Sequence, residues 1–145
     1  MSTKNKTVAG PRKPQILVSD ADLQRLTSLA EAVIERSPEI ADELLSELER
    51  ARVVKAKAIP DNVIRMGSTV IYKPDDDQPR RVSLVFPGEA DIALGKISIL
   101  TPIGTALLGL SPGQSIEWIA RDQRRHRLTI ESVDNSALAV QQQLA

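Results

Sequence analysis

The stretch Gly95–Trp118, GKISILTPIGTALLGLSPGQSIEW, decides the fold of the second half of the chain. Its alternating isoleucines predict a strand over Lys96–Leu100. Pro102 suits the first turn of a helix, and the apolar run after it predicts that this helix continues to Leu110. A Ser-Pro-Gly turn then leads into a second strand over Ser115–Ala120. The stretch offers no acid–base, nucleophilic or metal chemistry, so its role lies in packing or binding.

Further strands are predicted before and after this stretch, in segments that have a two-residue repeat and are separated by turn residues. They cover Thr69–Lys73, Arg80–Phe86 and His126–Val133, and a polar turn over 74–79 joins the first two. We therefore predict an α+β fold in which an antiparallel sheet packs against one helix.

The first third of the chain carries a helical pattern, after a short strand expected over Gln15–Val18. Ser19 with Asp22 three residues on is a capping-box arrangement, and Pro38 suits the start of a second helix. Apolar residues recur at helical spacing at Leu23, Leu26, Ala30, Val33, Ile34, Ile40, Leu44, Leu48 and Ala51. Two amphipathic helices with almost no loop between them predict a short antiparallel hairpin, a coiled coil with arms of about 16 residues and about 24 Å.

These patterns divide the chain into four segments. Residues 1–14 are expected to form a flexible tail, 15–57 the hairpin, 60–135 the sheet domain, and 136–145 a C-terminal tail. The linker is placed at 58–61.

Composition excludes several classes of function. Nineteen basic residues balance nineteen acidic ones, so independent binding of nucleic acid is not expected. The absence of cysteine and the single histidine, His126, argue against thiolate chemistry and two-histidine metal sites, and we expect no cofactor or metal. No apolar run approaches the roughly 20 residues that span a bilayer, and the N-terminal residues lack the apolar core of a signal peptide. We expect a cytoplasmic protein that does not enter the membrane.

Five short sequence blocks occur in a diagnostic order: GSTV at 67–70, EAD at 89–91, ISI at 97–99, TPIG at 101–104 and ALLG at 106–109. This succession resembles the C-terminal domain of the bacterial Gre transcript-cleavage factors, which has an FKBP-like fold. The variants VFPGEAD, TPIGTALLGL and GQSIEW, with SDADLQRL near the N-terminus, look closer to the smaller Gre-like regulators of nucleoside diphosphate kinase, which bind RNA polymerase. The resemblance covers about residues 60–133, and residues 16–30 fit the same smaller relatives.

The resemblance implies a non-enzymatic transcription regulator that docks on the rim of the RNA polymerase secondary channel and meets nucleic acid only within that complex. The matching docking residues here are Ser98, Leu100, Thr101, Pro102 and Ile103. An alternative interpretation makes the apolar residues of this segment core, and Pro102 a simple helix start. Leu100 is apolar where Gre relatives often have Asn or Asp, so the contact is expected to differ in detail.

The turn of the predicted hairpin is acidic. In Gre factors, acids at the hairpin tip help to hold a catalytic magnesium ion, and the corresponding tip here contains Glu35, Ser37, Glu39, Asp42 and Glu43. Acids at the start of a helix also favour its dipole, which explains the same residues without a metal. The Asp-Leu-Ser-Glu-Asn type of tip block is absent, and each arm is shorter by about 15 residues, or about 20 Å. We expect a factor that competes with longer Gre factors without stimulating cleavage.

A basic cluster precedes the last predicted strand. It contains Arg121, Arg124, Arg125 and Arg127 beside His126. It either faces nucleic acid or an acidic polymerase surface, or forms a solvated loop.

A rival function also stays open, in which the hairpin serves as an interaction module for self-association or for a nucleotide-metabolism enzyme.

Overall fold

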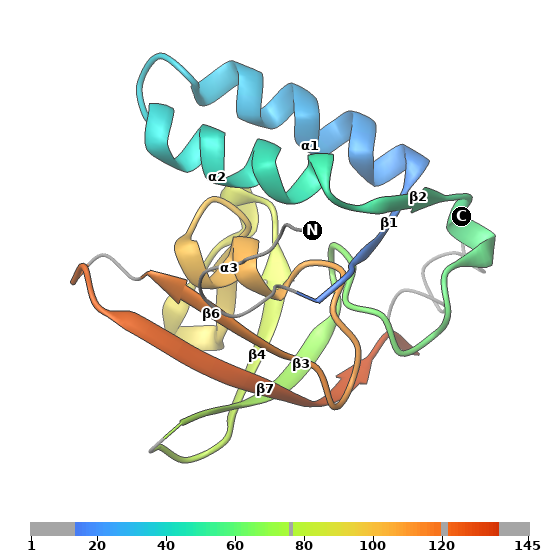
Figure 1. Ribbon diagram of the computed structural model, residues 1–145, viewed down its shortest axis with the longest axis vertical. Helices are drawn as coiled ribbons and strands as arrows, with labels where there is room; N and C mark the ends of the chain where they lie inside the picture. The colour runs from blue at the N-terminus through green and yellow to red at the C-terminus, as the bar shows by residue number, and fades with distance from the viewer. Residues whose placement is uncertain (1–13, 76, 120–121, 137–145) are drawn as a thin grey trace, which may run out of the picture.

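The computed structural model describes residues 14–75, 77–119 and 122–136. Helices lie over one face of a curled sheet, which confirms the predicted α+β class (Figure 1). The elements are β1 (Leu17–Ser19), α1 (Asp20–Val33), α2 (Pro38–Glu49), β2 (Arg52–Val54), η2 (Ala56–Ala58), β3 (Thr69–Pro74), β4 (Arg80–Val85), η3 (Pro87–Glu89), η4 (Ile92–Leu94), β5 (Lys96–Ser98), α3 (Pro102–Leu107), β6 (Ser115–Ile119) and β7 (Arg125–Asp134). The tails were predicted over 1–14 and 136–145, and all but residues 14 and 136 of them lie outside the described residues, as do residues 76, 120 and 121.

The main sheet of the described chain has the strand order β5-β4-β3-β7-β6. The β3/β4, β3/β7 and β6/β7 pairs are antiparallel, as predicted. The β4/β5 pair is parallel, which departs from the antiparallel sheet we expected. The reason is the connection between these strands: residues 86–95 carry the chain back past β5, so that it enters β5 in the same direction as β4.

A small parallel sheet closes the base of the helical hairpin. β1 pairs with β2, with Leu17 opposite Arg52 and Ser19 opposite Val54. The sequence predicted a strand near β1 but assigned the region of β2 to the hairpin, because three residues are too few to show a period of two. The helices are correspondingly shorter than predicted, with 14 and 12 residues and lengths of about 21 and 18 Å.

Local contacts fix the start of α1 and the turn between the two helices. The Ser19 hydroxyl oxygen accepts the backbone N–H of Asp22 at 3.0 Å, as the capping-box pattern predicted. After α1, the N–H groups of Arg36 and Ser37 both donate to the carbonyl of Val33. Pro38 then occupies the first turn of α2, as predicted.

The hairpin packs onto the sheet domain. Leu26, Ala30 and Leu44 are fully buried and belong to one hydrophobic core with Leu107 and Leu128. Figure 1 shows the two hairpin helices lying across the body, and α2 contacts α3. Ile34, which the helical pattern placed in the apolar stripe, is 40 % exposed because it lies at the C-cap of α1, where the chain turns away from the core.

Polar contacts also tie α1 to the body. The guanidinium of Arg25 lies 4.4 Å from the centre of the Phe86 ring, a cation–π contact between α1 and the residue after β4. Burial raises the pKa of the Asp22 carboxyl, although the charges of Arg65 and Arg25 and a hydrogen bond from the Met66 backbone oppose the increase. α1 is therefore held by side-chain contacts along the body as well as by apolar packing.

Candidate functional site

The turn between β5 and α3, residues 98–103, is the most tightly organised of the predicted site segments. The Ser98 hydroxyl accepts the Leu100 N–H at 3.0 Å. The Ser98 carbonyl accepts the Thr101 hydroxyl at 2.7 Å and the Thr101 N–H at 3.1 Å. The Thr101 oxygen in turn caps α3 by accepting the Gly104 N–H at 3.1 Å. This network presets the shape of the turn.

α3 follows the turn and approaches it most closely at Gly104. A Cβ atom at this position would lie 2.1 Å from the Ser98 carbonyl oxygen, so only glycine fits without moving the backbone. Thr105 adds a buried hydrogen bond from its hydroxyl to the Ile99 carbonyl at 2.8 Å. Ser98 is thus held by the turn and approached closely by α3, and Ile99 is held by α3 and, through its N–H, by the Val85 carbonyl at 2.9 Å.

The structure assigns the residues of this segment to two roles. The alternative interpretation expected Ile97, Ile99, Ile103, Leu107 and Leu108 in the core. Ile99, Leu107 and Leu108 are buried there, whereas Ile97 and Ile103 are half-buried and pack against it. Ser98, Leu100, Thr101, Pro102 and Ile103 are each only half-buried. Leu100 and Ile103 rest on the core while part of each side chain faces solvent. A hydrogen-bonded turn with half-exposed apolar and hydroxyl groups is suited to protein contact.

The predicted tip residues surround the turn between α1 and α2. Glu35, Glu39, Asp42 and Glu43 are exposed, and Ser37 is the half-buried N-cap residue of α2. Glu39 lies in the first turn of α2, where its charge favours the helix dipole. Within the described residues, no three acidic or histidine side chains gather closely enough to hold a metal ion.

The predicted basic cluster is divided by the strand on which it lies. Arg125 and Arg127 point from the same face of β7, while the ring of His126 stacks on Trp118 on the other face, with ring centres 5.2 Å apart. Arg124 is exposed in the turn before β7, and Arg121 lies outside the described residues.

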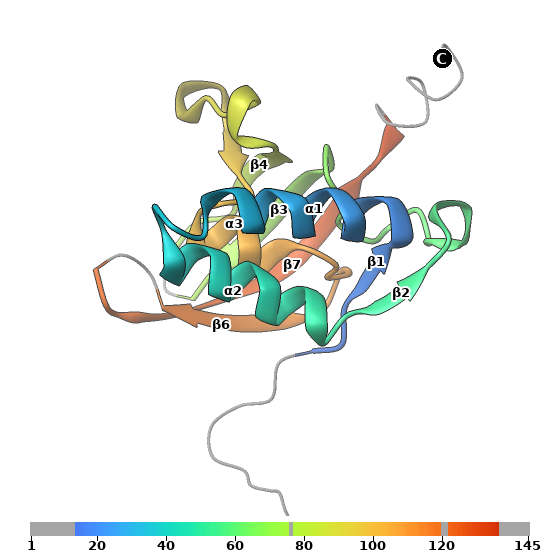
Figure 2. The same ribbon diagram turned by 90° about the horizontal axis from the view of Figure 1, so that it is seen from above.

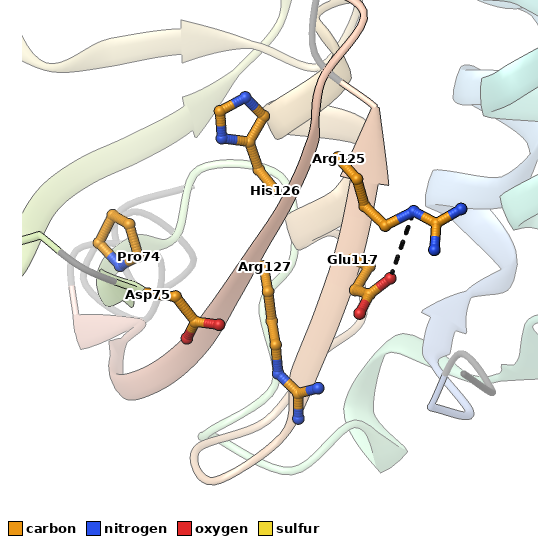
Figure 3. A pocket seen from close by; sticks show the side chains of 6 residues that line it. All are labelled: Pro74, Asp75, Glu117, Arg125, His126 and Arg127. Atoms are coloured by element: carbon orange, nitrogen blue, oxygen red, sulfur yellow. Dashed lines mark ion pairs between the residues drawn. The ribbon is translucent and has the colours of Figure 1, made fainter. Parts of the chain in front are cut away.

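Acids balance these cations in an open recess of about 430 Å³ beside β7 (Figure 3). It is lined by Pro74, Asp75, Glu117, Arg125, His126 and Arg127. Glu117 faces Arg125 with 3.7 Å between the carboxylate and the guanidinium nitrogen. Asp122 lies between β6 and β7, close in sequence to the residues that line the recess. Hydrogen bonds from the Arg124 backbone and from His126 lower the pKa of its carboxyl. A surface that binds nucleic-acid phosphates carries an excess of basic side chains, whereas this recess contains both acidic and basic ones.

Sequence reasoning missed one exposed feature. Ile92 and Leu94, in η4, are 87 % and 69 % exposed. The preceding EAD block contributed only to the family resemblance. An isolated pair of apolar residues in a turn has no periodicity that reveals whether the side chains face solvent. No helix within the described ranges is long and apolar enough to cross a membrane.

Comparison with known proteins identifies the family to which this fold and turn belong. The model for the C-terminal domain of the transcription elongation factors GreA and GreB matches residues 59–135, more than half of the chain. The chain belongs to the GreA/GreB family. A second model, for the Rnk N-terminus, matches residues 14–54 of this family member and so covers the hairpin.

Individual relatives agree with this assignment. The regulator of nucleoside diphosphate kinase from Escherichia coli strain K12 is 36 % identical over 107 residues, which are 73 % of this chain and 79 % of the relative. The transcription elongation factor GreA from Azorhizobium caulinodans is 34 % identical over 78 residues, or 53 % of this chain. The chain spans about half the length of that longer factor, since 50 % of the factor is covered.

A solved structure extends the similarity to most of the chain. The GreA/GreB elongation factor from Nitrosomonas europaea superposes with a TM-score of 0.67 and 38 % sequence identity, over 82 % of this chain and 98 % of that one. The relatives are named as regulators and transcription factors, not as enzymes. Family membership supports a transcription-factor-like role.

Proposed function

We propose that this protein is a non-enzymatic, cytoplasmic regulator that binds RNA polymerase at the rim of the secondary channel through the turn at residues 98–103. The preset geometry of that turn carries the proposal. Leu100, Pro102 and Ile103 expose apolar surface beside the Ser98 and Thr101 hydroxyls, and Gly104 and Thr105 fix the backbone beneath them. A contact surface that is already ordered loses less entropy on binding.

The hairpin over 15–57 and the domain over 60–135 are proposed to act as one body. Their apolar side chains share a core, and Arg25 contacts Phe86 across the junction. The helices have only 14 and 12 residues, and α2 packs against α3, so the tip stays near the body instead of reaching far into a channel. We therefore propose that the protein occupies the channel entrance and competes with longer Gre factors without stimulating transcript cleavage.

A binding and cleavage experiment tests both parts of this proposal. Core RNA polymerase is captured with the immobilised protein, and a full-length Gre factor is titrated as competitor. The proposal expects capture at micromolar concentration, displacement by the competitor, and no stimulation of RNA cleavage in a backtracked complex. Capture that the competitor leaves unchanged would place the contact elsewhere on the polymerase. Strong cleavage stimulation would refute the non-cleaving role.

A second candidate uses the hairpin as an interaction module for another partner. The name of the Escherichia coli relative refers to nucleoside diphosphate kinase, which makes that enzyme the partner to test. The burial of Leu26, Ala30 and Leu44 weighs against this candidate, because the apolar stripe is already covered by the protein's own core.

A further inference from the structure

We propose that Ile92 and Leu94 form a second anchor for the same polymerase surface, at the opposite end of β5 from the turn at 98–103. This inference rests on the proposed function. It begins from exposure: Ile92 is 87 % and Leu94 69 % exposed, more than any other large apolar side chain of the described residues. Exposed apolar groups that lie together mark interaction sites more often than scattered ones do.

The turn that carries these two side chains is built to hold them outward. The Asp91 carboxylate accepts the Ala93 N–H at 3.1 Å and so caps η4. Asp91 and Lys96 exchange two backbone hydrogen bonds, each of 2.9 Å, which close the turn against β5. Gly95 completes the turn with a positive φ of 73°, and a side chain there would also crowd the Arg81 carbonyl at 3.3 Å. The exposure of Ile92 and Leu94 is therefore fixed by a defined structure.

The location of the turn connects it to the proposed docking surface. β5 is the edge strand of the main sheet, with η4 at its start and the turn at 98–103 at its end. Both η3 and η4 contact β5, so the two turns lie against the same edge strand. Figure 2 shows the yellow turns between β4 and β5 projecting sideways from the body, clear of both hairpin helices. A partner that binds the end of β5 can reach η4 without meeting the hairpin.

The size of the patch favours a large partner over a second copy of the chain. Stable interfaces bury about 1,200–2,000 Å² in total, far more than two aliphatic side chains supply on each side. Two such side chains instead suit anchors at one part of a larger interface, where a few apolar residues contribute most of the affinity. An apolar pocket on the polymerase beside the main contact is the expected receptor for Ile92 and Leu94.

Affinity measurements on four proteins test this inference: the wild type, the double variant Ile92→Ser/Leu94→Ser, the variant Leu100→Ser and the control Ile119→Ser. Ile119 is 54 % exposed on β6, at the opposite edge of the sheet. Core polymerase is titrated against each protein, and thermal unfolding is followed in parallel. We expect the double variant to raise Kd tenfold or more with an unchanged melting temperature, and the control to change Kd by less than twofold.

Each other outcome overturns a defined part of the account. If Leu100→Ser weakens binding while the η4 double variant stays within twofold of the wild type, the second anchor is wrong and the proposed function stands. If the wild type does not bind polymerase, both fail together. If the wild type is a dimer in sedimentation and the double variant a monomer, the patch serves a second copy of the chain, and the inference is wrong.

Discussion

The α1–α2 hairpin and the segment from η3 to α3 use apolar residues in opposite ways. In the hairpin, Leu26, Leu44 and Leu48 are almost completely buried against the sheet domain, and the exposed positions are mainly charged. In the other segment, Ile92, Leu94 and Leu100 remain partly or largely exposed although hydrogen bonds fix their backbone. The hairpin therefore contributes to stability, and the η3–α3 segment is the part that we propose contacts a partner.

The resemblance to longer Gre factors suggests a hairpin that projects freely, but this hairpin packs on the body. A coiled-coil arm that reaches into a channel needs an apolar seam between its two helices and a free outer surface. Here the inner surface of the hairpin is shared with α3 and the sheet, so the hairpin has become part of the core. The predictions below test that division between a structural hairpin and a binding segment, from the largest expected effect to the smallest.

Truncating a buried hairpin residue should destabilise the whole protein. Leu44 is fully buried, and Leu44→Ala is expected to lower the free energy of unfolding by about 2–5 kcal/mol, because it leaves a cavity in the shared core. Chemical denaturation followed by helix and tryptophan signals measures the loss. Both signals should shift together. A helix transition that separates from the Trp118 transition would show that the hairpin folds independently of the domain.

Changing the glycine beneath the 98–103 turn should have the next largest effect. Gly104→Ala places a Cβ atom 2.1 Å from the Ser98 carbonyl oxygen, so the turn must shift, and we expect a loss of about 1–3 kcal/mol. Gly88→Ala in η3 is the matched control, since nothing lies within 4 Å of a Cβ added there. Equal stability of the two variants in urea denaturation would mean that α3 does not press on the turn as described.

Removing the cap of α3 should give a smaller effect in the same turn. Thr101→Val keeps the side-chain shape but deletes the hydroxyl that joins the Ser98 carbonyl to the Gly104 N–H. Loss of a helix N-cap costs about 1 kcal/mol. Thr101→Ser, which retains the hydroxyl, should recover most of this loss. A Val variant as stable as the wild type would show that the turn is held by packing alone.

The smallest effect concerns the junction between α1 and the body, and it appears as a dependence on pH. Burial raises the pKa of Asp22 above the 3.8 of a free side chain, so the folded protein holds this proton more tightly than the unfolded chain. The contribution of Asp22 to stability is therefore complete below pH 3.8 and is lost as the pH rises through the folded pKa. The free energy of unfolding of the wild type, relative to Asp22→Asn, should fall over that window. A relative stability that increases with pH would contradict the buried position of the carboxyl.

The elements with clear periodicity were predictable from the sequence. Ser19 and Pro38 mark the true starts of α1 and α2, because capping and N1 preferences act locally. The β5–α3 segment was likewise predicted, although α3 ends at Leu107, three residues before the predicted end, where Gly109 takes a positive φ. Local chemistry alone is enough to fix such boundaries to within a few residues.

The remaining features depend on contacts between distant residues. The pairing of β1 with β2 brings together residues about 35 positions apart, and neither three-residue strand has a pattern of its own. The parallel β4/β5 pair depends on the path of residues 86–95, which no local preference specifies. For the candidate site, the sequence predicted contact roles for Leu100 and Pro102, which stay predictions, but the exposure of Ile92 and Leu94 could be seen only in the fold.

The most direct test of the account compares polymerase affinity when either region is altered at its surface. One variant carries Leu100→Ser in the β5–α3 turn, and the other carries Glu35→Gln and Glu39→Gln at the exposed hairpin tip. Titration of core RNA polymerase at one salt concentration gives Kd for both and for the wild type. The account predicts a rise in Kd of about tenfold or more for the turn variant and less than about twofold for the tip variant. The reverse order would contradict the claim that the turn, and not the hairpin, carries the contact.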